Sequence, residues 1–292
     1  MDCQNADLSG PSLNMRARVY VTYHKGTHVV NGEILEALQV GPGPALEGCR
    51  NRDNTGKNIA DRNDQYCEMT AAYWAWQNTI GELDYVGLLH YRRFLDFTAT
   101  ENRLDCWGVM NWPCFTTDFV THFGLEDACI RNVLQTCDIV LPRRWSVRQA
   151  GFRSLEEHYA SAPHHHRQDL LRCRAVVAEQ QPSYLTSWDR VLKADCGWFN
   201  NMFVIRTDIY DAYCRWLFPL LAELERRIPL QSYGLQERRV LGYLAERLFN
   251  VWLQQRLESN EKWVVREFDR VFVQDPSAKI WDPKPQNRAI ET

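Results

Sequence analysis

The chain has 292 residues, of which 45% are hydrophobic and 24% charged, which is enough apolar material for one large α/β domain or two small ones. Its formal net charge of −3 argues against nucleic acid as the main partner, because binding a phosphate backbone requires a basic face. The sequence has neither the ~18-residue apolar run of a membrane span nor the apolar core of a secretion signal. We therefore expect a soluble, cytoplasmic protein whose only membrane contact would be peripheral, at the inner face of the membrane.

The ten cysteines are spread along the chain without a C-x-x-C pair. This spacing is typical neither of a zinc ribbon nor of the dense disulfide framework of a small secreted domain. Buried free thiols in a reducing compartment are the better interpretation.

The first elements follow from hydrophobic periodicity. Residues 1–15 are predicted to be a disordered leader, and the alternating pattern at 18–23 predicts a first strand. Gly and Pro residues then open a long loop over 41–56. Asn63 is placed to N-cap a helix that ends at Gly81, and a buried strand is expected at 85–89.

The later elements alternate in the same way. They are a largely helical stretch at 115–135, a strand at 138–141, a polar, histidine-bearing insertion at 143–166 suited to an acceptor-side loop or lid, a helix at 167–180, a strand within 197–205, helices at 208–227 and 236–257, and a polar tail at 276–292. Strands that alternate with helices indicate a parallel-rich α/β sheet. We expect it to form one domain over 16–275.

The segment after strand 85–89 carries the clearest chemistry. It reads His90-Tyr91-Arg92-Arg93 and lies where an α/β sheet holds its ligand, at the carboxyl end of a strand. Arginine presents a planar fork that matches phosphate oxygens. The pattern therefore predicts a site for a phosphorylated small molecule. The alternative interpretation is that the arginines form structural ion pairs with carboxylates such as Asp84 or Asp96.

A second candidate anion site is the loop at 53–58. Its successive backbone amides, placed before a helix, could form an anion-binding nest, and its side chains could bind sugar or ribose hydroxyls. The alternative is a surface turn closed by its own side chains. The residues concerned are Asp53, Asn54, Gly56 and Asn58.

Long, ordered blocks of this sequence resemble the bacterial capsular-polysaccharide and O-antigen glycosyltransferases, whose best-described members transfer galactofuranose from UDP-galactofuranose. The blocks span roughly 18–256. They include YVTYHK at 20–25, DNTGKNI at 53–59, YCEMTAAYWAWQN at 66–78, YVGLLHYRRF at 85–94, NMFVI at 201–205 and GYLAERL at 242–248.

The resemblance implies a GT-A-like fold and transfer of galactofuranose, with inversion to a β-linkage, from a UDP-sugar to a growing, lipid-linked cell-surface glycan. For the loop at 53–58, the resemblance favours donor binding over a simple surface turn. The other residues that it implies are Thr22, His24, Lys25, Asn63, Glu68, Thr70 and Tyr91 for the donor, and Trp198, Asn200 and Asn201 for the acceptor side.

Transfer from a nucleotide sugar requires positive charge near the leaving diphosphate. Many GT-A enzymes hold a divalent metal with a D-x-D motif, and this sequence has none. The hypothesis is that Arg92 and Arg93, aided by His90, replace the metal, so that no divalent metal is required.

The acceptor hydroxyl must also lose a proton to a positioned base. Inverting GT-A enzymes commonly use a carboxylate early in a late helix, so the resemblance makes Glu246 the first candidate and Asp195 the second. For Glu246 the alternative interpretation is a salt bridge with Arg247.

Three rival functions remain open at this stage. The first is a transferase for another nucleotide sugar, and the second is a non-catalytic module that binds glycan or nucleotide. The third is a metal hydrolase built on His164-His165-His166 with His158 nearby. Adjacent histidines rarely bind one ion tetrahedrally, so a solvated loop is favoured there.

Overall fold

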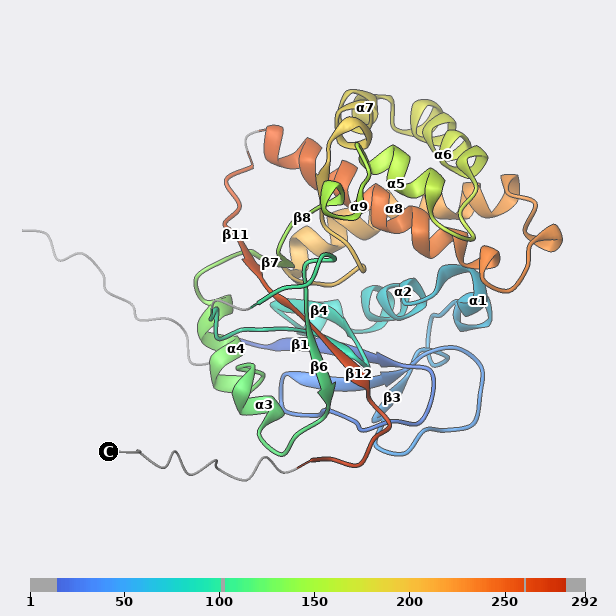
Figure 1. Ribbon diagram of the computed structural model, residues 1–292. Helices are drawn as coiled ribbons and strands as arrows, with labels where there is room; N and C mark the ends of the chain where they lie inside the picture. The colour runs from blue at the N-terminus through green and yellow to red at the C-terminus, as the bar shows by residue number, and fades with distance from the viewer. Residues whose placement is uncertain (1–14, 101–102, 260, 282–292) are drawn as a thin grey trace, which may run out of the picture.

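The structure, a computed structural model, describes residues 15–100, 103–259 and 261–281 (Figure 1). The leader expected at 1–15 lies outside these residues except for its last one, and the expected tail is described only as far as 281. That part of the tail lies along the domain. The Trp281 N–H donates to the Phe115 carbonyl at 3.0 Å, and the Trp281 carbonyl accepts from the Thr117 N–H at 3.2 Å.

Ten strands of the described residues form one sheet. They are β1 (Ala17–Tyr23), β2 (Leu35–Gln39), β3 (Asn51–Arg52), β4 (Tyr85–His90), β5 (Arg93–Leu95), β6 (Val109–Cys114), β7 (Ile139–Pro142), β10 (Phe203–Arg206), β11 (Val265–Phe268) and β12 (Arg270–Asp275). The main path runs β11-β7-β10-β4-β1-β2-β3 and is parallel except at β10, which is antiparallel to both of its neighbours. The sheet continues from β4 through β5 and β12 to β6.

The centre of the sheet is the parallel pair of β1 and β4. Thr22 pairs with His90, so the two strands end side by side at the same edge. Gly87 allows this close arrangement, because a Cβ there would lie 2.8 Å from a Val204 methyl group and 3.0 Å from a Val19 methyl group. Any larger residue would push the neighbouring strands apart.

Helices cover both faces of the sheet, as Figure 1 shows. They are α1 (Asn63–Tyr66), α2 (Met69–Asn78), α3 (Phe119–His122), α4 (Asp127–Leu134), α5 (Leu155–Ser161), α6 (Arg167–Gln180), α7 (Leu185–Lys193), α8 (Thr207–Arg227) and α9 (Val240–Glu258). The larger core cluster lies on the side of α2 and α5 to α9, and the smaller one on the side of α3 and α4. Successive side chains of β1 point to opposite faces of the sheet. Tyr20 therefore packs in the larger cluster, and Val19 and Val21 pack in the smaller one.

The helix expected from Asn63 to Gly81 is interrupted. Cys67 has a φ of 53°, in the left-handed region, and this residue separates α1 from α2. Asn63 does not cap a helix with its side chain, which instead donates to the Cys67 carbonyl at 2.8 Å and to Thr70 Oγ1 at 2.9 Å. The helical segment ends at Asn78, and Gly81 lies in a following 3₁₀ turn.

Other predicted elements differ in detail. The stretch at 115–135 contains only the short helices α3 and α4, joined at Gly124 with a φ of 59°. The insertion at 143–166 is more structured than a loop, since it holds α5 and the strand β8 (Trp145–Ser146), which pairs with β9 (Cys196–Gly197). The predicted elements do not include the strands β2, β3, β5, β6, β11 and β12.

Nine cysteines lie in the described residues, and all nine are free thiols. Four of them, Cys67, Cys137, Cys173 and Cys214, are buried. Over the same part of the chain, no helix combines the length and the apolar character that crossing a bilayer would need.

Candidate active site

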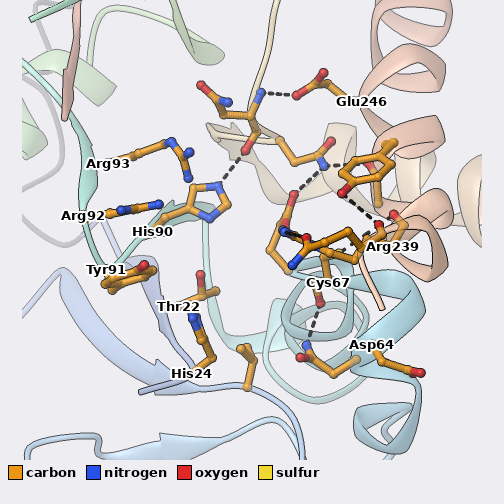
Figure 2. A pocket seen from close by; sticks show the side chains of 18 of the residues that line it. Thr22, His24, Asp64, Cys67, His90, Tyr91, Arg92, Arg93, Arg239 and Glu246 are labelled. Carbon is orange, nitrogen blue, oxygen red and sulfur yellow. Dashed lines mark hydrogen bonds between the residues drawn. The ribbon is translucent and has the colours of Figure 1, made fainter. Parts of the chain in front are cut away.

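A cavity of about 550 Å³ opens at the edge where β1 and β4 end. This volume lies within the range of small-molecule sites, roughly 300–1,000 Å³. Thr22 and His24 reach it from the end of β1, and the segment 90–93 reaches it from the end of β4. Figure 2 shows these side chains along one side of the cavity, with Glu246 and Arg239 on the other.

Arg92 and Arg93 bring two positive charges to this cavity without a carboxylate partner among the described residues. Their guanidinium carbons lie 4.8 Å and 5.4 Å from the centre of the Phe272 ring, so both charges contact the same aromatic ring. The Nε of Arg92 is buried and has no hydrogen-bond partner. Burial and the neighbouring Arg92 lower the pKa of Arg93. Two like charges held together in this way favour an anionic ligand.

The alternative interpretation, that these arginines form structural ion pairs with Asp84 or Asp96, does not fit the structure. Asp84 pairs with Arg16 at 3.7 Å. Asp96 accepts hydrogen bonds from the side chains of Thr98 and Thr100. No salt bridge links Arg92 or Arg93 to either carboxylate in the described ranges.

The helix side of the cavity is organised by Glu68, Asn201 and Arg239. The Nδ2 of Asn201 donates to Glu68 Oε1 at 2.6 Å and to the Gly242 carbonyl at 3.1 Å, which links α2 to α9 across the cavity floor. The Nε of Arg239 donates to Cys67 Sγ at 3.3 Å. Arg239 thus joins Arg92 and Arg93 on the cavity wall. Like them, it has no salt bridge to a carboxylate among the described residues.

The turn at Asn200 connects the two sides. Asn200 and Asn201 have φ values of 76° and 48°, a left-handed conformation that asparagine tolerates better than most residues. The Asn200 N–H donates to Glu246 Oε2, and the Asn200 carbonyl accepts from His90 Nε2 at 2.6 Å. Burial lowers the pKa of His90, with Arg93 acting in the same direction and Glu68 opposing it. Through its hydrogen bond to the Asn200 carbonyl, His90 orients the Asn200 turn.

Glu246 also forms a salt bridge with its neighbour Arg247. Its Oε1 accepts from Arg247 Nη1 at 2.6 Å, so the salt bridge considered as the alternative for Glu246 is present. Arg247 is only 1% exposed and donates a second hydrogen bond to His158 Nδ1 at 2.9 Å. Burial and the charge of Arg247 lower the pKa of His158 to about 4. The carboxylate still faces the cavity, and each of its oxygens keeps a second lone pair.

The family model described as a domain of unknown function (DUF4422) matches residues 18–258. The chain belongs to the DUF4422 family. No curated protein matches it. Among solved structures, this DUF4422 chain is similar to the apo structure of the bifunctional glycosyltransferase WbbM, with 38% identity and a TM-score of 0.83. The match covers 89% of this chain and 46% of the WbbM chain, so the chain spans less than half of that protein. It confirms the predicted fold class, a mostly parallel sheet flanked by helices.

Five of the residues predicted to bind the donor and the predicted segment at 90–93 of the DUF4422 chain meet at the cavity. Its wall includes Thr22, His24, Asn63, Glu68, His90, Tyr91, Arg92 and Arg93, together with Asn200, Asn201 and Glu246. Burial, followed by the charge of Lys25, lowers the pKa of His24. Lys25 itself is exposed and lies outside the wall, 5.4 Å from the centre of the Tyr91 ring. Thr70 is buried behind the wall, where it holds Asn63.

The loop at 53–58 does not reach the cavity. Asn54, Gly56 and Asn58 are exposed and do not line it, and Asn58 bonds back to the Gly56 carbonyl at 3.0 Å and to the Ala60 N–H at 3.2 Å. Asp53 is fully buried, and its Oδ1 accepts the Gly41 N–H at 3.0 Å. The loop is closed by Asn58 and joined to α2, where Asn78 bonds to the backbone of Lys57 and Trp74 donates to Thr55.

Asp195 and Trp198 also lie apart from the cavity. Asp195 pairs with Arg148 at 2.6 Å, and the hydrogen bond from Arg148 lowers its pKa. Trp198 is buried and donates from Nε1 to Glu267 at 2.8 Å. Of the two candidate bases, only Glu246 faces the cavity.

The histidine run has a packing role. His165 lies between the rings of Tyr159 and Tyr243, with ring centres 4.4 Å and 4.2 Å away, and burial lowers its pKa to about 3. His166 pairs with Glu237 at 3.0 Å. In the part of the chain that the structure describes, no three His, Cys, Asp or Glu side chains gather where they could hold a metal ion.

Sequence reasoning missed several residues of the cavity wall, above all Arg239, with Asp64, Gln236 and Tyr243. Tyr243 falls inside the block at 242–248, next to the predicted Glu246. Arg239 lies just before α9, in a polar stretch that carries no motif of its own. Its place in the site depends on how α9 packs against α1, which the sequence pattern does not specify.

Proposed function

We propose that this protein is a glycosyltransferase that moves a sugar from a UDP-sugar to a cell-surface glycan. The observation that carries this proposal is the cavity itself, where Arg92 and Arg93 face Glu246 from the opposite wall and Arg239 lies on the Glu246 side. Guanidinium groups without carboxylate partners suit a diphosphate, and a carboxylate opposite them suits an incoming hydroxyl. The similarity to the glycosyltransferase WbbM supports the same class of reaction.

In the proposed reaction, the diphosphate of the donor lies against Arg92 and Arg93, and the nucleoside lies toward Thr22 and His24. Glu246 takes the proton of the acceptor hydroxyl, and the oxygen forms a bond to the anomeric carbon. The bond from that carbon to the phosphate oxygen breaks, and UDP leaves with the electron pair. The arginines neutralise the charge that develops on UDP.

Glu246 lies opposite Arg92 and Arg93, and this arrangement favours inversion. An attack from the Glu246 side displaces a leaving group held on the arginine side, which inverts the configuration at the anomeric carbon. The proposed donor is UDP-galactofuranose, which gives a β-linkage, and the proposed acceptor is a growing, lipid-linked glycan. No divalent metal enters this scheme, since the arginines supply the positive charge.

A thermal-shift screen against nucleotide sugars, followed by a UDP-release assay, tests the proposal. Ligands that bind only the folded state raise its melting temperature. We expect UDP and UDP-galactofuranose to do so, and chelator treatment to leave UDP release unchanged. A larger shift with another nucleotide sugar would reassign the donor, and binding without any UDP release would indicate a non-catalytic module.

Glu246→Gln tests the assigned base. The amide keeps the shape of the side chain and an oxygen that can accept from the Asn200 N–H, but it cannot take a proton at neutral pH. We expect sugar transfer to fall roughly 10²- to 10⁴-fold, with an unchanged thermal shift on UDP binding. Transfer at the wild-type rate would remove Glu246 from the mechanism.

A further inference from the structure

A second cavity, of about 380 Å³, lies beside the first. The two cavities share three wall residues, Arg93, Asn200 and Glu246. Glu246 therefore stands at the boundary between them and can be reached from both. A molecule in the second cavity would have one edge against the proposed base.

Aromatic side chains form one wall of this second cavity. They include Trp107, Trp145 and Phe199, and the ring centres of the two tryptophans lie 5.6 Å apart. Trp145 and Phe199 are buried, whereas Trp107 is 51% exposed. A cavity lined by aromatic side chains is typical of a small-molecule site.

The backbone of Trp107 is held in place although the indole is exposed. The backbone N–H donates to Asp105 Oδ1 at 2.8 Å, and the backbone carbonyl accepts from Arg270 Nη2. The next residue, Gly108, has a φ of 66°, and a Cβ there would lie 2.7 Å from the Trp145 ring. Only glycine fits this turn, which fixes the two indoles beside each other. A wall ordered in advance loses little conformational entropy when a ligand binds.

Polar groups complete the cavity. Arg270 is 6% exposed, donates to Asn200 Oδ1 at 2.9 Å and has no salt bridge to a carboxylate within the described ranges; its Nε has no hydrogen-bond partner. Asp105 Oδ2 accepts from Asn111 Nδ2 at 2.7 Å, and both side chains line the cavity. Donors and acceptors around an aromatic wall match the ring of a sugar, which presents C–H groups on its face and hydroxyl groups on its edge.

We propose that the second cavity binds the terminal hexose of the acceptor glycan, stacked on Trp107, with the hydroxyl to be glycosylated directed toward Glu246. This assignment rests on the proposed function, because it places the acceptor opposite a donor in the first cavity. The alternative occupant is the sugar of the donor itself. If the acceptor hexose occupies the cavity, the acceptor KM depends on Trp107. If the donor sugar occupies it, the donor KM does.

Trp107→Ala and Trp107→Phe, with Trp281→Ala as the matched control, test the assignment. Trp281 is also exposed, at 61%, and lies outside both cavities. The assay measures UDP release from UDP-galactofuranose, first alone and then with a panel of octyl hexosides as acceptors. We expect at least one hexoside to accelerate release by the wild-type protein. Trp107→Ala should raise the KM for that hexoside about tenfold or more, as removal of a central aromatic contact does.

The donor readouts separate the possible outcomes. In Trp107→Ala, the donor KM and the acceptor-free hydrolysis should match the wild type, Trp107→Phe should keep most of the acceptor affinity, and Trp281→Ala should behave as the wild type. Three results would overturn the acceptor assignment and leave the transferase proposal standing. They are an unchanged acceptor KM in Trp107→Ala, a raised donor KM in that variant, and no acceleration of release by any hexoside. A wild-type protein that neither binds nor hydrolyses any nucleotide sugar overturns both.

Discussion

The loop at 53–58 and the segment at 90–93 had the same predicted role, binding the donor, but they occupy different environments. The segment at 90–93 follows a central strand, and its arginines enter the cavity without carboxylate partners in the described structure. The loop follows the short edge strand β3, and its polar groups bond within the loop and to neighbouring segments, including Asn78 of α2. The two regions share polar residue types and differ in position, because the sheet brings the ends of its central parallel strands together at the cavity.

The largest effect should come from the central segment. Arg93→Ala removes a positive charge from the cavity, and we expect UDP release to fall roughly 100- to 1,000-fold, the usual cost of one donor to a developing anion. The matched control is Lys57→Ala, which removes an exposed cation from the loop and should leave UDP release unchanged. Equal effects of the two substitutions would contradict the distinction between the regions.

Arg93→Lys refines the same prediction. Lysine keeps the charge but loses the planar fork that matches two phosphate oxygens. Its UDP release should lie between the wild type and Arg93→Ala, while the melting temperature of all three proteins stays similar. A lysine variant as inactive as the alanine variant would indicate that geometry, more than charge, stabilises the leaving group.

The sequence predicted the strands β1, β4, β7 and β10 and the long helices α6, α8 and α9 because their hydrophobic patterns are strong and local. It missed the short β2 and the late strands β11 and β12. The pairing of these late strands joins distant parts of the chain, as between β12 and β6. For the same reason Arg270, at the start of β12, was not foreseen beside Asn200. Packing over 70 residues of sequence separation brought them together.

Asp53→Asn should have a smaller effect, on stability only. Burial raises the pKa of Asp53, although hydrogen bonds from Thr70 and the Gly41 N–H oppose the shift. The folded state therefore binds this proton more tightly than the unfolded state, so the contribution of Asp53 to stability is present below the unfolded pKa and is lost as pH rises through the folded pKa. The Asn variant cannot ionise, and its melting temperature should exceed that of the wild type at neutral pH.

Melting curves of both proteins from about pH 4 to about pH 8 measure this difference, since the range spans ordinary carboxyl pKa values and neutrality. The advantage of Asp53→Asn should shrink toward the acidic end, and its donor KM should equal that of the wild type. A variant that is less stable at neutral pH would show that the ionised carboxylate is stabilised where it is buried.

The smallest effect is expected at Asn58, which is exposed and bonds only to Gly56 of its own loop and to the nearby Ala60. Asn58→Ala removes the hydrogen bonds to the Gly56 carbonyl and the Ala60 N–H, and a typical hydrogen bond contributes about 1 kcal/mol to stability. We expect a small decrease in melting temperature and an unchanged donor KM. A raised donor KM with unchanged stability would mean that the loop moves to the donor when it binds, which would bring both regions into one site.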